Sequence, residues 1–233
     1  MILLPNWWKV VEDVKLYASL GISGLTFEGS ATIATADLHE MRAWVLTQLM
    51  WNASRDGDSL IREFLVNVYS EGAAGLILQH MKAYTAEIDR IGFYVTASDP
   101  PTAAYFSPQV IWTSLTALDE AIANCSAASE TLPRSKVVKA IGALRVSPWF
   151  LALSNWEALC AWTVSEGLPW PLEASMHASL AAFSDNATAY LGPRTLQTEA
   201  SALAAMNASK DMRCGDRGPL RPRATAARLD GRF

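Results

Sequence analysis

The chain has 233 residues, of which 51% are hydrophobic, and carries a formal net charge of −4 at pH 7. This length and composition fit one large domain with a sizeable core, and the acidic balance argues against a nucleic-acid-binding surface. Charges interrupt the apolar runs before they reach bilayer-spanning length, so we expect no membrane partner. The apolar start, residues 1–4, lacks the basic flank and the length of a secretory signal peptide.

The first 36 residues predict one helix and one strand. Apolar side chains recur at helical spacing over residues 6–20, and Gly21 is a typical stop. The run Ile22–Glu28 is rich in β-formers and is closed by Gly29. A lone strand cannot satisfy its own hydrogen bonds, so its partners must lie elsewhere. We therefore expect the strand to be unpaired, and interpret the chain as part of a larger protein.

Residues 37–209 predict a helical bundle. We expect Asp58 to cap the second of its helices, and Ser107 with Pro108 to open a later one. Pro148 lies inside the long apolar stretch 136–165 and should kink or split it. Turns are expected at 98–102, 129–133 and 169–171, and helices over 172–190 and 195–206.

Residues 210–233 differ in charge from the rest of the chain. They carry seven Lys and Arg against three acidic residues, whereas residues 1–209 carry 12 against 20. Apolar residues are too few here to form a core, so we expect a disordered, solvated tail. Basic tails can bind nucleic acid or a partner, but the solvated interpretation is favoured, and no nucleic-acid partner is expected.

Three cysteines, an odd number with no CxxC pair, make a disulfide framework or a zinc site unlikely. The three histidines lack metal-ligand spacing, and no phosphate-binding loop is present, so we expect neither metal nor cofactor. Asn-x-Ser/Thr sequons favour a secretory origin, whereas Asn and Ser also gather at helix ends as caps, so the compartment stays open. These candidate glycosylation sites are Asn52, Asn124, Asn186 and Asn207.

One block of the chain resembles a known family. Leu46–Asn52 ends a helix at a Trp-Asn pair, 56–64 follows as an Asp-rich turn and a helix, and 69–74 reads Tyr-Ser-Glu-Gly-Ala-Ala. This block resembles the signature stretch of the domain-of-unknown-function 4838 family, although Ala53 replaces its usual proline. Shorter similarities, such as the Gly-rich strand 21–29, extend the resemblance over residues 3–195.

The resemblance implies a glycoside-hydrolase-like protein whose barrel is related to those of α-glucuronidases and hexosaminidases. It therefore implies a mainly α fold: residues 1–36 would be the last strand–helix unit of a TIM-type barrel, and 37–209 a helical C-terminal domain. A complete barrel needs about eight such units. The end of a barrel strand faces the catalytic side, so Glu28 is the candidate sugar-contacting or acid–base residue. Trp7 and Trp8 are candidate sugar-stacking rings.

Two functions follow as expectations. The first is the C-terminal part of a glycoside-hydrolase-like protein acting on polysaccharide, inactive alone because glycoside hydrolysis needs two positioned carboxylates. The second is a non-catalytic helical interaction or scaffold module. In the first case carbohydrate is the partner of the parent protein, and the uncovered barrel edge at Ile22–Phe27 would favour self-association.

Overall fold

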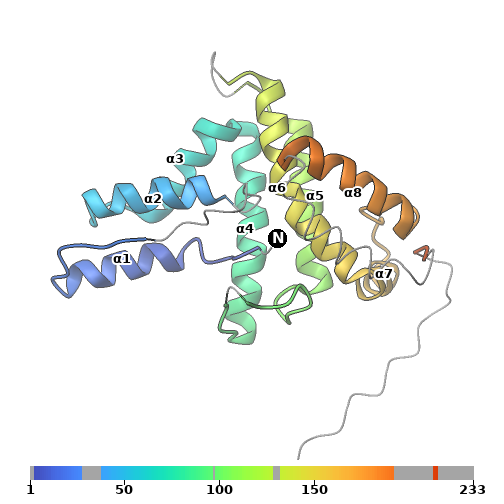
Figure 1. The fold of residues 1–233 in the computed structure, drawn as a ribbon, viewed down its shortest axis with the longest axis horizontal. Coiled ribbons are helices and arrows are strands. Elements are labelled where there is room, and N and C mark those ends of the chain that lie inside the picture. The colour runs from blue at the N-terminus through green and yellow to red at the C-terminus, as the bar shows by residue number, and fades with distance from the viewer. Residues whose placement is uncertain (1–2, 28–37, 97, 128–131, 192–211, 215–233) are drawn as a thin grey trace, which may run out of the picture.

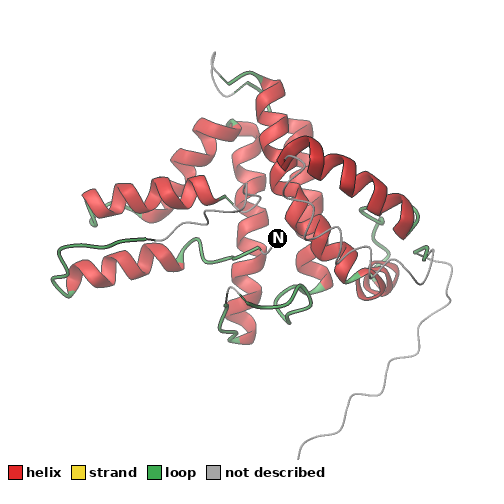
Figure 2. Cartoon of the chain, in the orientation of Figure 1, coloured by secondary structure: helices red, strands yellow, loops and turns green. Residues whose placement is uncertain are grey.

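The computed structural model describes residues 3–27, 38–96, 98–127, 132–191 and 212–214. Within them the chain forms α-helices and no strand (Figures 1 and 2). The mainly α fold class is therefore confirmed. The helices are α1 (Lys9–Ser19), α2 (His39–Trp51), α3 (Gly57–Tyr69), α4 (Glu71–Ile91), α5 (Pro108–Asn124), α6 (Arg134–Ser154), α7 (Trp156–Ser165) and α8 (Met176–Leu191).

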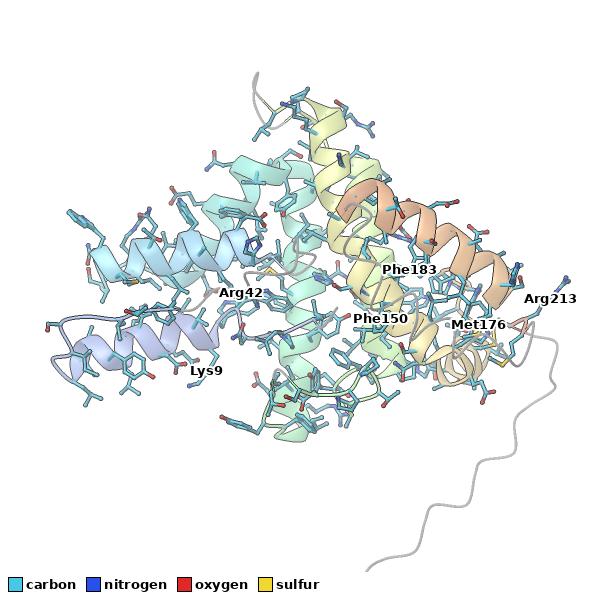
Figure 3. The ribbon with its side chains drawn as sticks, in the orientation of Figure 1. Lys9, Arg42, Phe150, Met176, Phe183 and Arg213 are labelled. Atoms are coloured by element: carbon cyan, nitrogen blue, oxygen red, sulfur yellow. A yellow bond between two sulfur atoms is a disulfide. The ribbon has the colours of Figure 1, made fainter. Side chains whose placement is uncertain are left out.

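Helix α4 stands at the centre of the arrangement. It packs against α3 on one side and α5 on the other, while α1 and α2 extend outward together and α8 lies across α6 (Figure 1). The N-terminal segment is tied to α2 by Arg42, whose guanidinium donates to the backbone oxygen of Leu4 (2.8 Å) and to Asn6 Oδ1 (2.9 Å) (Figure 3). Between α6 and α8 the rings of Phe150 and Phe183 lie 6.4 Å apart.

The strand predicted over Ile22–Glu28 is not formed in the described residues, and no barrel remnant is visible. Residues 22–27 follow α1 as irregular chain without ladder partners, and Ile22 and Phe27 remain 45% and 38% exposed. The prediction was wrong because β-propensity expresses packing against neighbouring strands more than a preference of the backbone itself. Glu28 lies outside the described residues.

Of the two helix caps predicted from the sequence, one is confirmed and one needs correction. Ser107 caps α5 as predicted, since its hydroxyl accepts from the Val110 amide (3.4 Å) and Pro108 takes the first position. The cap of α3 is Asp56, not Asp58: the Asp56 carboxylate accepts from the Ser59 amide at 2.8 Å. Asp56 and Asp58 lie two positions apart, and the extended backbone of Asp56 places this residue at the N-cap and Asp58 in the first turn.

Pro148 lies inside α6 without dividing it. The division between α6 and α7 comes at Asn155, whose side-chain amide donates to the backbone oxygens of Leu151 (2.8 Å) and Pro101 (2.9 Å). A competing side-chain hydrogen bond thus ends the helix where the proline does not. Helix α6 is also long and apolar enough to cross a bilayer by length and composition, but 67% of its apolar window is buried inside the fold, as in a core helix.

The contact between α4 and α5 depends on a glycine. A Cβ on Gly72 would lie 2.5 Å from the backbone oxygen of Asn124, and backbone cannot move aside as a side-chain tip can. We expect Gly72→Ala to lower the free energy of unfolding by about 1–3 kcal/mol, as overpacking does. The matched control is Gly75→Ala one turn later, where nothing lies within 4 Å. It should raise stability by up to about 1 kcal/mol through helix propensity. Equal urea midpoints for the two variants would contradict this account.

Candidate functional site

The two tryptophans predicted to stack on sugar do not form an open platform. Trp7 is 1% exposed and packs its ring against those of His80 and Tyr84 in the core. Trp8 is half-buried, and its indole N–H donates to the Asp58 carboxylate at 2.7 Å. Because Trp7 and Trp8 are consecutive, their side chains point in different directions. Trp7 is buried, so only the Trp8 ring is accessible to a ligand.

The sequons are distributed over separate helix ends and faces. Asn52 and Asn124 are exposed, whereas Asn186 is half-buried within α8 and donates to the backbone oxygen of Ala182 (2.7 Å). Asn207 lies outside the described residues. Glycosylation stays a prediction at all four positions.

A cleft of about 380 Å³ opens between α5, α6, α8 and the segment 170–173 that precedes α8. This volume is within the range of small-molecule sites. Each wall comes from a different part of the sequence, so the cleft exists only in the folded chain. Its lining residues are Asp119 and Ile122 from α5, Gly142, Arg145 and Trp149 from α6, Trp170, Pro171, Leu172 and Glu173, and Asn186 and Tyr190 from α8.

One side of the cleft is a fixed ion pair. The Arg145 guanidinium donates through Nε and Nη2 to the two carboxylate oxygens of Asp119, at 2.5 and 3.0 Å. It also lies 4.4 Å from the centre of the Trp149 ring, a cation–π distance. Bidentate pairing and stacking together hold both charged groups in place.

Another part of the lining is aromatic. Trp170 packs edge-on against Trp156 with 4.6 Å between ring centres, and its indole N–H donates to the backbone oxygen of Glu173 at 2.9 Å. On α5, Trp112 donates to the backbone oxygen of Pro169 at 3.0 Å and so fixes the start of this segment. Helix-breaking residues 169–171 thus form an anchored wall.

Tyr190 completes the aromatic lining from α8. A Cβ on Gly142 would lie 2.4 Å from its ring, so the ring occupies the space that the glycine leaves on α6. Glycine in a helix interior costs about 1 kcal/mol relative to alanine. The close approach of the Tyr190 ring explains why a glycine stands at position 142 despite this cost.

The polar groups of the cleft differ in availability. The Glu173 side chain is exposed, and the described residues provide no hydrogen-bond or ion-pair partner for its carboxylate. Asn186 uses its amide N–H on the helix, which leaves its side-chain oxygen as an acceptor. Glu173 and Asn186 are therefore the groups ready to bind a ligand, while Arg145 and Asp119 bind each other.

A disulfide attaches residues 212–214 to α7. Cys160 of α7 is bonded to Cys214 across 54 residues, although the odd cysteine count had indicated that a disulfide framework was unlikely. Residues 212 and 213 also contact the start of α8. The Met176 amide donates to the backbone oxygen of Met212 (2.8 Å), and Arg213 forms an isolated antiparallel β-bridge with Ser175, next to Met176 (Figure 3). Residues 212–214 are thus packed, contrary to the predicted disorder of the tail; the rest of 210–233 lies outside the described residues.

A second polar cluster is closed to ligands. His80 is 1% exposed, its Nδ1 lies 2.6 Å from the Ser114 hydroxyl, and Tyr84 packs on it with ring centres 5.5 Å apart. Burial lowers the pKa of His80 to about 3 and raises the pKa of Tyr84 well above its ordinary value. This cluster belongs to the core between α4 and α5. The described residues also contain no group of His, Cys, Asp and Glu that could hold a metal.

The cleft was missed from sequence because its members span residues 119–190 without a motif. One local signal was present: prolines on both sides of Trp170 fix an aromatic ring in a rigid turn. Its partners across the cleft require the packing of α8 on α6, which hydrophobic spacing does not specify.

Comparison with known proteins gives one similarity. No curated protein and no solved structure matches the chain. The family model described as "Domain of unknown function (DUF4838)" matches residues 1–82, the part that contains α1 to α3 and the first half of α4. The family resemblance of the residues after 82 stays a prediction.

Proposed function

We propose that this chain is a carbohydrate-binding helical module of a glycoside-hydrolase-like protein that acts on polysaccharide, and that the module does not hydrolyse glycosides by itself. The observation that carries the proposal is the cleft, in which aromatic rings and polar side chains line the same space. A pyranose ring has an apolar face of C–H groups and an edge of hydroxyls, and it needs both kinds of contact. The glycoside-hydrolase context is the expectation raised by the family resemblance of the sequence, and residues 1–82 match a family model whose own function is not assigned.

The carboxylates of the cleft support binding without hydrolysis. Asp119 is engaged by two hydrogen bonds from Arg145, so it is not free to donate a proton to a leaving group or to attack a sugar. Glycoside hydrolysis by the usual route needs an acid and a base or nucleophile on opposite sides of the bond. Glu173 alone offers one unpaired carboxylate there.

The test pairs binding with turnover. We expect the protein to be retained on insoluble polysaccharide and to release no product from uronic-acid or amino-sugar glycosides. Tyr190→Leu should weaken binding about two- to tenfold, the range of one aromatic contact. Tyr94→Leu is the control, because Tyr94 is 86% exposed and does not line the cleft.

Two results would contradict this proposal. Equal retention of the Tyr190 and Tyr94 variants would place binding elsewhere. Turnover that disappears in Glu28→Gln would show that the chain has a working site around the residue suggested by the family resemblance. Absence of turnover in both wild type and Glu28→Gln is the expected result.

A second candidate function is a protein-interaction module. Large apolar side chains are exposed at the end of α1 and beyond it, with Leu16 at 52% and Leu20 at 67%, and Trp51 at the end of α2 is 92% exposed. These helices extend away from α4 (Figure 1). Sedimentation of Leu20→Lys against the control Val164→Lys, on α7, separates the candidates: a mass that falls only in the Leu20 variant favours self-association.

A further inference from the structure

We propose that the cleft selects a sugar that carries a free amino group, with the Glu173 carboxylate as its ionic partner. This inference rests on the proposed carbohydrate-binding function and specifies its ligand.

The charges of the cleft lead to this ligand. Three charged residues line it: Asp119, Arg145 and Glu173. The first two neutralise each other through the bidentate pair. The remaining charge is negative and belongs to Glu173, which has no partner in the described part of the chain. A cationic group on the ligand gains an attraction here that a neutral hydroxyl does not.

An acidic sugar is disfavoured by the same arrangement. To bind its carboxylate through the same Nε and Nη2 edge, Arg145 would have to release Asp119 and leave that charge unpaired. Two of the guanidinium nitrogens are already used, and its plane is stacked on Trp149. Breaking a close, bidentate pair costs more than a new exposed contact returns.

The aromatic lining favours the same sign of charge. Indole and phenol faces attract an ammonium group through the quadrupole of the ring. Trp170 and Glu173 also share one short segment, in which the indole N–H binds the Glu173 backbone oxygen. The Ser179 hydroxyl donates to that same oxygen at 3.4 Å. The ring and the carboxylate-bearing residue are thus fixed relative to each other before the ligand arrives, which limits the entropy lost on binding.

The experiment is a calorimetric titration of the full chain with four trisaccharides. They are the β-1,4 trimers of glucosamine, N-acetylglucosamine and glucose, and the α-1,4 trimer of galacturonic acid. We expect the glucosamine trimer to bind about fivefold more tightly than the glucose trimer, the upper range for an exposed ion pair. This preference should shrink as salt is added. Glu173→Gln should remove it, and Glu157→Gln, an exposed change on α7 outside the cleft, should leave it intact.

The possible failures are distinguishable. Equal binding of the amino and neutral trimers, or preference for the acidic one, would overturn the amino-sugar inference and leave the carbohydrate-binding function standing. Binding of tetramethylammonium as tightly as the glucosamine trimer would also overturn it, because the sugar would then contribute nothing. No binding of any trimer by a folded protein would overturn both proposals. A glucosamine preference retained in Glu173→Gln would assign the charge recognition to another residue and overturn the role of Glu173.

Discussion

Removal of the Cys160–Cys214 disulfide is expected to lower the free energy of unfolding by about 4 kcal/mol, from the loop-closure entropy of a 54-residue separation. The bond also carries residues 212–214 to the start of α8, where the Met176 amide donates to Met212. Urea unfolding of Cys160→Ser/Cys214→Ser against wild type measures the difference.

Reductant and the third cysteine provide the controls. Cys125 is buried and free, and its thiol donates to the backbone oxygen of Ile122. Reductant should lower the urea midpoint of Cys125→Ala as it does that of wild type, and should not change that of the double serine variant. If reductant leaves the urea midpoint of the wild type unchanged, the Cys160–Cys214 disulfide either does not form or does not stabilise the fold.

Acid is expected to destabilise the protein through His80 at a pH where ordinary carboxylates are still ionised. Burial holds the pKa of His80 at about 3 in the folded chain, against about 6.5 when unfolded. Above pH 6.5 both states are neutral at this residue. As the pH falls below 6.5, the unfolded chain binds a proton that the folded chain does not, so stability is lost down to about pH 3. Between pH 7 and 5 this loss is about 2 kcal/mol.

Replacement of His80 tests the assignment. His80→Gln keeps a hydrogen-bonding side chain beside Ser114 but does not titrate, so its stability should be nearly constant from pH 7 to 5, even if lower throughout. The exposed His177 provides the control, since His177→Gln should retain the wild-type pH profile. The pKa values of Asp56, Glu87 and Asp99 are lowered by hydrogen bonds, first from Ser59, Arg90 and Thr96 respectively, so these carboxylates contribute below the tested window. A sloping profile in the His80 variant would contradict the assignment.

The helices could be predicted from sequence because their causes are local. Ser107 with Pro108 carries its cap within four residues, and the apolar stripe of α4 repeats within one helix. The strand predicted over residues 22–27 was wrong for the opposite reason. The sequence meets the local requirements of a strand, but a strand forms only with a partner strand. The split predicted at Pro148 was wrong, because α6 continues through this residue and ends beside Asn155, whose side chain donates to the backbone oxygen of Pro101, 54 residues away. The alternative, a kink at Pro148, stays a prediction.

The cleft and the disulfide are long-range features, and neither was predicted. Arg145 belongs to no local motif, and its partner Asp119 lies one helix earlier. Cys214 lies in a stretch whose composition indicates disorder, so the bond to Cys160 had no compositional signal. Spacing along a chain constrains neighbours on one helix, whereas these pairs depend on which helix faces become adjacent.

The family match and the central helix α4 end at different residues. The match to the family model extends to residue 82, inside a helix that continues to Ile91. Met81 and Tyr84, on either side of that point, are both fully buried. The end of the matched segment therefore falls inside one packed helix, and a domain boundary placed at that residue would cut α4.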